Sequence, residues 1–397
     1  MKLPVASILF SIGFMASVSE SLASDFFDPL DGQLDLSNYL SENAYGLLPV
    51  PIIITDPAVA GGLGVVGLFF HESESEKEAR IKAMRSSDGG AQQHIIPPSV
   101  SAIAVAATGN DSLFAGGGHM GFFKQGKVRY VGGGGYGDVN LDFYGSGDIG
   151  AGRAISLNTE AVMVMQKLKF KTGDLPLFVG VTQRYVSAEI TPNSLGNLEA
   201  LLPPEYSEQL TALLTQDVAT SGLGLLAEWD SRDNVFSPKT GYHYELEQVW
   251  YRNDFGSDVD YDLTHIEGRN YWQLADSWLL GFRFDSSYAD SDGLLPPFAT
   301  PAVDLRGIPA MRYQGKFVGA LETELTWQID RRWSVKAFTG AARASNAISS
   351  FSDADTLATF GGGFRYQIAR RYGFDMGVDL ARGPDDTVFY ITAGSAW

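Results

Sequence analysis

The stretch that decides the fold runs from Ser277 to Tyr288 and reads SWLLGFRFDSSY. Apolar side chains recur at every second position, and charged or small polar ones stand between them. The apolar set is Trp278, Leu280, Phe282, Phe284 and Tyr288, and the opposite set is Arg283, Asp285 and Ser287. Alternate side chains of a β-strand point to opposite faces, so this stretch predicts a strand with one apolar and one polar face.

The same alternation recurs along the chain, at 221–231, 241–251 and 316–329. A soluble β-sandwich would also alternate, but its turns would be short at both edges. Here short connections such as Asp330-Arg331-Arg332 interleave with long ones such as 289–315 from about residue 155 onward. Outer-membrane barrels have short periplasmic turns and long extracellular loops. The pattern therefore predicts an all-β fold, a transmembrane antiparallel β-barrel in the bacterial outer membrane that crosses it many times.

A count of strands back from Trp397 gives sixteen, an even number as closure of such a barrel requires. The barrel is expected over residues 58–397. The count depends on dividing 125–147 near Tyr136-Gly137-Asp138, because that segment is too long for one strand of about 10 residues. The expected strands are 58–70, 98–109, 112–123, two within 125–147, 155–170, 177–190, 221–231, 241–252, 262–274, 277–288, 316–329, 333–343, 357–369, 372–382 and 387–397.

Composition supports a barrel and narrows the chemistry. Glycine supplies 45 of 397 residues and aromatic residues 12%, as expected of strands that alternate between lipid and a polar lumen. The absence of cysteine excludes disulfides and cysteine-ligated metals, and the net charge of -18 argues against nucleic acid as a partner. No spacing of residues indicates a metal site, a cofactor or a catalytic motif, so no enzyme is expected.

The N-terminus resembles a signal peptide over residues 1–23, with Lys2, an apolar stretch and Ser21-Leu22-Ala23 before Ser24. A membrane anchor is the alternative, but the apolar part is shorter than the ~20 residues of a spanning helix. Residues 24–57 are expected to be a periplasmic lead-in. The apolar stretch that follows, 46–70, contains Pro49, Pro51 and Asp56 and is therefore interpreted as lead-in plus first strand, not as a helix.

Two loops have patterns of their own. Segment 72–86 is rich in opposite charges at helical spacing and is interpreted as a solvated surface loop. Segment 203–216 carries Leu210, Leu213 and Leu214 at the spacing of a short amphipathic helix. That helix could cover the barrel mouth or simply cap its own loop.

Four motifs, in order, resemble the BamA/TamA superfamily, also called the bacterial surface antigen family. The resemblance covers about residues 220–397. Its residues are a periplasmic turn (Asp230, Arg232, Asp233, Pro238, Gly241), a loop motif (Leu305, Arg306, Gly307, Ile308), the strand stretch Glu324-Leu325-Thr326-Trp327 and a C-terminal strand (Phe389, Ile391, Trp397).

The resemblance implies that the loop folds into the lumen and that Arg306 pairs there with Glu324 or, second, Glu322. A solvated Arg306 is the alternative. Gly307 would allow close backbone approach or a positive φ. The chain departs from the family in three places: Thr300-Pro301-Ala302-Val303 replaces a Gly-Gly pair, Ile308 replaces an aromatic residue, and 338–342 lacks a second acidic partner for the arginine.

The superfamily's assembly and secretion members carry periplasmic POTRA modules. Only about 30 residues separate Ser24 from the first expected strand, too few for one such module. The sequence therefore predicts a member without POTRA modules.

The leading functional hypothesis is assistance in inserting or translocating proteins or lipids at the outer membrane, through a weak seam between the first and last strands. Gly61, Gly62, Gly64 and Gly67 would weaken strand pairing there, or else relieve crowding against the loop. The expected surroundings are outer-membrane lipid and lipopolysaccharide, with a separate periplasmic or client protein as a possible partner.

The alternative is a passive cation-favouring channel or a structural barrel. It rests on the carboxylates expected in the lumen, which are Glu228, Asp230, Glu245, Glu247, Glu267, Asp285, Glu322 and Glu324. His265 and Glu267 share one lumen face and are interpreted as hydrogen-bonding residues.

Overall fold

The structure is a computed structural model of the chain. It describes residues 26–28, 30–37, 47–71, 99–143, 155–193, 215–235, 237–370, 373–394 and 397. The expected signal peptide and the 72–86 loop lie outside these residues. So does most of the expected 203–216 helix, at whose end a strand already begins at Gln216.

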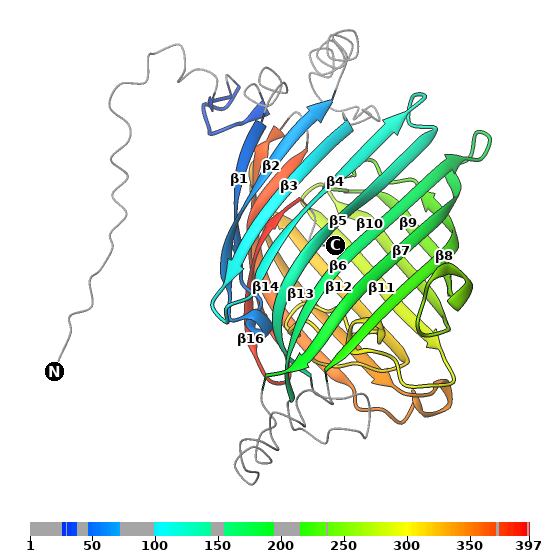
Figure 1. The fold of residues 1–397 in the computed structure, drawn as a ribbon. Helices are drawn as coiled ribbons and strands as arrows, with labels where there is room; N and C mark the ends of the chain where they lie inside the picture. Colours follow the sequence, from blue (N-terminus) through cyan, green and yellow to red (C-terminus); the bar gives the residue numbers. More distant parts are fainter. Residues whose placement is uncertain are drawn as a thin grey trace, which may run out of the picture.

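One antiparallel sheet of sixteen strands makes up the fold, and each strand pairs with its neighbours in sequence (Figure 1). The strands are β1 (Leu47–Ile54), β2 (Gly62–His71), β3 (Ser99–Thr108), β4 (Leu113–Phe123), β5 (Val128–Phe143), β6 (Ile155–Lys171), β7 (Leu177–Pro192), β8 (Gln216–Asp230), β9 (Gly241–Tyr251), β10 (Tyr261–Ala275), β11 (Trp278–Asp290), β12 (Phe317–Gln328), β13 (Trp333–Ser345), β14 (Leu357–Ala369), β15 (Phe374–Arg382) and β16 (Thr387–Ala393).

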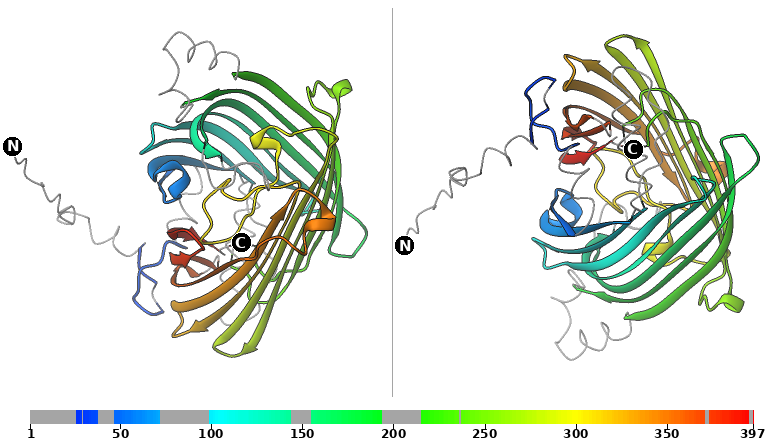
Figure 2. Two further views of the ribbon diagram at one scale, coloured as in Figure 1. Left: turned by 90° about the horizontal axis from the view of Figure 1, so that it is seen from below. Right: turned by 90° about the horizontal axis from the view of Figure 1, so that it is seen from above.

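The sheet curls into a nearly closed barrel, and its two edge strands, β1 and β16, face each other where the ring would close (Figure 2). No ladder pairing joins β1 to β16 in the described part of the chain. We call this unpaired boundary the seam.

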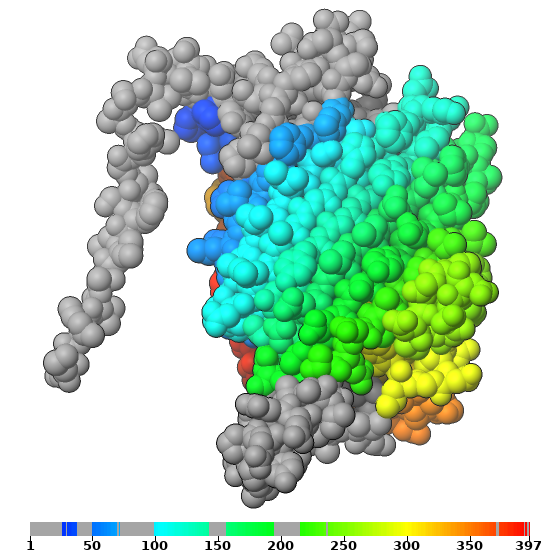
Figure 3. Space-filling model, viewed as in Figure 1, coloured from blue at the N-terminus to red at the C-terminus, as the bar shows by residue number. Residues whose placement is uncertain are grey.

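The two faces of the sheet differ as the alternation predicts. Outward side chains are apolar and open, for example Leu63 at 69% and Phe360 at 64% exposure, and Figure 3 shows this outer face over β2–β8. Inward side chains are polar and buried, for example Glu322 at 1% and Asp379 at 0%. An apolar outside and a polar inside are the arrangement that a lipid bilayer requires of a barrel.

Among the described residues, short 3-10 turns lie between some of the strands: η2 (Pro57–Val59), η4 (Asn253–Phe255), η5 (Pro297–Ala299) and η6 (Ile348–Ser350). None of the described helical segments is long and apolar enough to cross a membrane.

The sequence predicts the number of strands correctly but distributes them wrongly in two places. The division of 125–147 is wrong, because β5 runs without a break from Val128 to Phe143. The expected lead-in of 24–57 contains a strand, β1, which pairs with β2 along its whole length. The two errors cancel in the count.

Both errors have a physical cause. Glycines 132–135 and 137 give β5 no alternating pattern and look like a turn, but each lies opposite a residue of β4 and of β6. Pro49 and Pro51 argue against a strand in the interior of a sheet. β1 is an edge strand, where prolines are tolerated because their missing N–H groups can face away from the ladder.

Candidate functional site: the inward loop and the seam

The loop that joins β11 to β12, residues 291–316, folds into the barrel (Figure 2). Val303, Leu305 and Ile308 are buried in an apolar cluster on the inner wall. Gly340 of β13 makes room for the loop, because a Cβ there would lie 2.7 Å from Leu305 Cδ1. The wall residues of this cluster are Val318, Ala320, Ala342 and Leu357.

Arg306 lies at the centre of the inward loop's contacts and is 7% exposed. Its Nε is 2.6 Å from Glu322 Oε1, and its Nη1 is 2.8 Å from Glu324 Oε2. The guanidinium carbon also lies 3.6 Å above the ring centre of Phe338. Both expected carboxylates, which β12 carries, therefore lie against the Arg306 side chain. Arg306 is buried and is not a solvated loop residue.

A third acid, Asp379 of β15, lies 3.1 Å from Arg306 Nη1, and no motif in the sequence points to it. Arg365 donates two bonds of 2.6 Å to the same carboxylate, and Lys336 binds Glu324 at 2.6 Å. Three cations thus alternate with three buried carboxylates, so each desolvated charge has an opposite partner. The expected shortage of acidic partners for Arg306 is wrong.

The tip of the inward loop touches both sides of the seam. Gly307 has φ +94 and its N–H donates to the Tyr390 hydroxyl of β16 at 2.9 Å. Three residues later, the N–H of Ala310 donates to the Asp56 carboxylate in the turn between β1 and β2, at 3.2 Å to Oδ2. The loop is thus a bridge between the first hairpin and the last strand.

All eight lumen carboxylates of the channel hypothesis face inward, and each has a cationic partner. Glu228, Glu245, Glu267 and Asp285 even lie directly opposite one another on β8–β11. Such a row of like charges is unfavourable without compensation. Lysines and arginines supply it: Arg129–Glu228 2.8 Å, Arg232–Asp230 2.9 Å, Lys167–Glu245 2.5 Å, Arg184–Glu247 2.7 Å, Arg269–Glu267 2.9 Å, Arg283–Asp285 3.4 Å, Arg306–Glu322 2.6 Å and Lys336–Glu324 2.6 Å.

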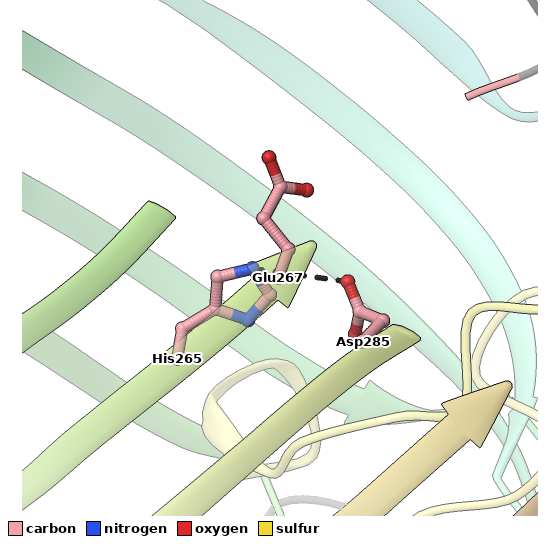
Figure 4. A group of neighbouring side chains, drawn as sticks. All are labelled: His265, Glu267 and Asp285. Carbon is pink, nitrogen blue, oxygen red and sulfur yellow. Dashed lines mark ion pairs between the residues drawn. The ribbon is translucent and has the colours of Figure 1, made fainter. Parts of the chain in front are cut away.

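His265, Glu267 and Asp285 form the one group among the described residues whose ligand atoms come close enough together for a metal ion (Figure 4). Arg269 and Arg283 already pair with the two carboxylates, and His265 Nδ1 bonds to the Ser287 hydroxyl at 2.9 Å. The two guanidinium groups thus already neutralise the carboxylates that a cation would need. We therefore assign this group to the lumen's hydrogen-bonding network.

The turn between β8 and β9 is built by the residues of the turn motif. Asp230 accepts two bonds from Arg232, and Asp233 Oδ1 accepts the N–H of Lys239 at 2.9 Å. Gly241 has φ +105 and lies so close to Ser231 that a Cβ would be 2.3 Å from its carbonyl oxygen. Pro238 lies between these contacts, in a turn tightened by side-chain bonds.

The C-terminal residues separate into two groups. Phe389 and Ile391 lie on the outer face of β16, 47% and 43% exposed. Trp397 does not continue the strand, which ends at Ala393. Its ring lies 5.7 Å from that of Tyr271 on β10, over Gly281 of β11, so the chain end turns inward. The expected strand 387–397 is therefore too long, and Trp397 is not part of an outward-facing strand.

A sixteen-stranded antiparallel barrel with an apolar outer face, a charged lumen and a long loop folded inside defines a transmembrane β-barrel of the outer-membrane type. The sequence matches no family model, and it matches no curated protein sequence.

Solved structures match across 87% of the chain. BamA from Haemophilus ducreyi lacking POTRA domains 1-3 has a TM-score of 0.52 and 12% identity, with 69% of that chain covered. CdiB from Acinetobacter baumannii has a TM-score of 0.53 and 10% identity, with 59% of that chain covered. CdiB from Escherichia coli has a TM-score of 0.50 and 12% identity, with 62% of that chain covered. The likeness to BamA agrees with the resemblance drawn from the motifs. The chain thus has the fold of the BamA and CdiB barrels.

Proposed function

We propose that the protein is a BamA/TamA-like barrel that assists the insertion or translocation of proteins or lipids at the outer membrane by opening at the seam. The observation that carries this proposal is the inward loop's bridge from Asp56 to Tyr390 across an unpaired strand boundary. A barrel that served only as a wall would gain stability from completing the ladder between its first and last strands.

β1 supports the proposal from the other side. Pro49 and Pro51 have no N–H to donate. Because they stand two residues apart, their backbone nitrogens face the same edge of β1. The other edge is fully paired with β2. The prolines therefore remove two donors from the edge that would have to pair with β16. The glycines of β2, in which the sequence analysis expected the weakness, lie one strand away from the seam.

The test is to lock the seam with disulfides. The natural chain has no cysteine, so every introduced pair is the only one. Cysteine pairs that combine residues 50–53 of β1 with 388–391 of β16 would be screened for cross-linking in the membrane. The matched control is Val50→Cys with Val66→Cys, which stand opposite each other in the β1–β2 ladder.

The readout is the folding of a small eight-stranded barrel added unfolded to liposomes that contain the protein. We expect a locked seam to reduce the folding rate of the added barrel to the rate in empty liposomes, and we expect reductant to restore the faster folding. The control pair should leave the rate unchanged. If the added barrel folds as fast with the locked protein as with the reduced protein, opening at the seam is excluded as the mechanism.

A further inference from the structure

A short segment ahead of the barrel, Phe26–Ser37, binds to the end of the barrel at which β12 meets β13 and β14 meets β15. Its own fold is a small hairpin: Phe27 and Leu34 form an antiparallel bridge, and Asp28 N–H donates to Gln33 O at 2.9 Å. Gly32 has φ +66 at the bend. Asp28, Asp31 and Asp35 each accept the N–H two residues further on, which fixes the three carboxylates to the backbone.

Those three carboxylates surround Arg332, whose side chain is 0% exposed. Its Nη2 is 2.7 Å from Asp28 Oδ2, its Nε 2.6 Å from Asp31 Oδ2 and its Nη1 2.6 Å from Asp35 Oδ2. Nη1 also donates to the Gln367 carbonyl at 3.0 Å, and Nη2 to Asp31 Oδ1 at 3.2 Å. An arginine has five N–H donors, and all five are used here.

The hairpin also binds to β14. Leu36 N–H donates to the Ile368 carbonyl at 2.7 Å, and the Tyr366 hydroxyl donates to the Leu34 carbonyl at 2.6 Å. Arg370 adds a bond from Nε to Asp28 at 2.6 Å. The attachment therefore combines main-chain bonds with buried, charge-assisted ones, which are the stronger kind.

The attachment joins parts of the chain that lie on opposite sides of the seam. Ile368 and Arg370 belong to the C-terminal side of the seam, whereas the same chain forms β1, on the N-terminal side, from Leu47 onward. β15 and β16 lie between them in the order of the sheet. The segment that precedes β1 in the chain is thus bound on the far side of the seam from β1.

We propose that Phe26–Ser37 is a strap that restrains the seam and that Arg332, with Arg370 and the Gln367 carbonyl, is a carboxylate-binding socket for it. The socket's ligand is an acidic hairpin with carboxylates at positions i, i+3 and i+7. The strap restrains the end of the seam at which β1 begins, and the inward loop restrains the end at which β1 meets β2. Without the strap, β1 keeps its ladder to β2, and Asp56 keeps its bond to Ala310.

The test measures the width of the seam in the full-length protein, without reference to activity. Spin labels on Val105 of β3 and Phe360 of β14, both outward-facing at 60% and 64% exposure, report distance across the seam. Labels on Val162 of β6 and Ile266 of β10 report the intact wall in a second protein. The variant is Arg332→Gln, and the matched control is Arg331→Gln, a neighbouring exposed arginine.

We expect Arg332→Gln to broaden the cross-seam distances and lengthen them by about one strand spacing, roughly 5 Å. The wall distances should stay as in the natural protein, and Arg331→Gln should change neither pair. Arg332→Lys should give an intermediate width, because an ammonium cannot supply five donors in a plane.

Asp28→Asn with Asp31→Asn and Asp35→Asn removes the charges from the other partner and should reproduce the effect of Arg332→Gln. Unchanged cross-seam distances in both variants would refute the strap. Equal broadening of both label pairs would also refute it, because Arg332 would then support the barrel in general and not the seam.

Discussion

Arg306 and Asp379 are 73 residues apart in sequence, and their side chains meet at 3.1 Å inside the barrel. The pair joins the inward loop to β15, next to the last strand, while Glu322 and Glu324 join the same guanidinium to β12. Arg306 thereby links β12 to β15. The inward loop that carries Arg306 also contacts the first hairpin, through the bond from Ala310 to Asp56.

Removing Arg306 should destabilise the barrel strongly. Arg306→Ala leaves three buried carboxylates with two cations, and breaking a buried charge cluster costs about 3–5 kcal/mol. Guanidinium unfolding in detergent micelles would measure the loss. The control, Arg312→Ala, breaks the partly exposed pair with Asp385 and should cost less than about 1 kcal/mol. Equal losses for the two variants would contradict a special role for Arg306.

Gly307 should tolerate no side chain. Its φ is +94, and a Cβ would lie 3.0 Å from Gly383 N. Gly307→Ala should therefore cost roughly 1–3 kcal/mol. Gly293 lies in the same loop without a positive φ and with no atom near its missing Cβ, so Gly293→Ala is the matched control. Thermal unfolding of the two variants checks the difference, and similar midpoints would contradict it.

The strap should withstand moderate acid. The hydrogen bond from Arg332 lowers the pKa of Asp31, and the pKa of Asp28 is also below its usual value, because bonds from Arg370 and Leu30 outweigh the effect of burial. Lowered carboxyl pKa values give stabilisation that is present above the unfolded value and is lost as the pH falls through the folded one.

The aspartate partners raise the pKa of Arg332, although its burial opposes this, so no accessible alkaline pH removes its charge. We therefore expect cross-seam label distances to be constant between about pH 5 and 8 and to broaden only below the ordinary aspartate range, near pH 3.8. Broadening near pH 6 would point to a histidine, not to the strap.

If the lumen conducts, its ion selectivity should be weak, because each of the eight carboxylates has a cationic partner. Lys169 contacts both Glu228 and Glu245. Lys169→Gln removes that charge and should shift the reversal potential in a salt gradient toward cation selectivity. Lys124→Gln, in the turn between β4 and β5, is the control. Strong cation selectivity in the natural protein would instead favour the channel hypothesis.

The sequence predicts most of the barrel wall well, because lipid outside and charge inside impose an alternation of apolar and polar residues on most strands. β11 and β12, with Trp278 and Glu322 on opposite faces, show this most clearly. The sequence does not predict β1 or the unbroken β5, because their residues meet other structural requirements than this alternation. Pro49 is compatible with an edge strand, and Gly134 allows β5 to approach β6 closely, since a Cβ there would lie 2.8 Å from Met163 O.

The candidate site was predictable only in part. The pair of Arg306 and Glu324 can be predicted, because the loop motif that contains Arg306 is followed directly by the strand that carries Glu324. Asp379 and the partners of Arg332 come from distant parts of the chain, which only closure of the barrel brings together. Asp28, Asp31 and Asp35 lie within the expected periplasmic lead-in of 24–57, and no local pattern indicates that carboxylates at this spacing will surround one arginine.

The glycines shared by β4 and β5 have a mechanical consequence. Gly116, Gly117 and Gly118 of β4 stand opposite Gly135, Gly134 and Gly133 of β5, so at three successive pairs these two strands carry no side chain on either face. Bare backbone resists bending less than backbone covered with branched side chains. Bending along this line would let β1 to β4 move together, so that the seam would widen while the ladders among those four strands stay paired.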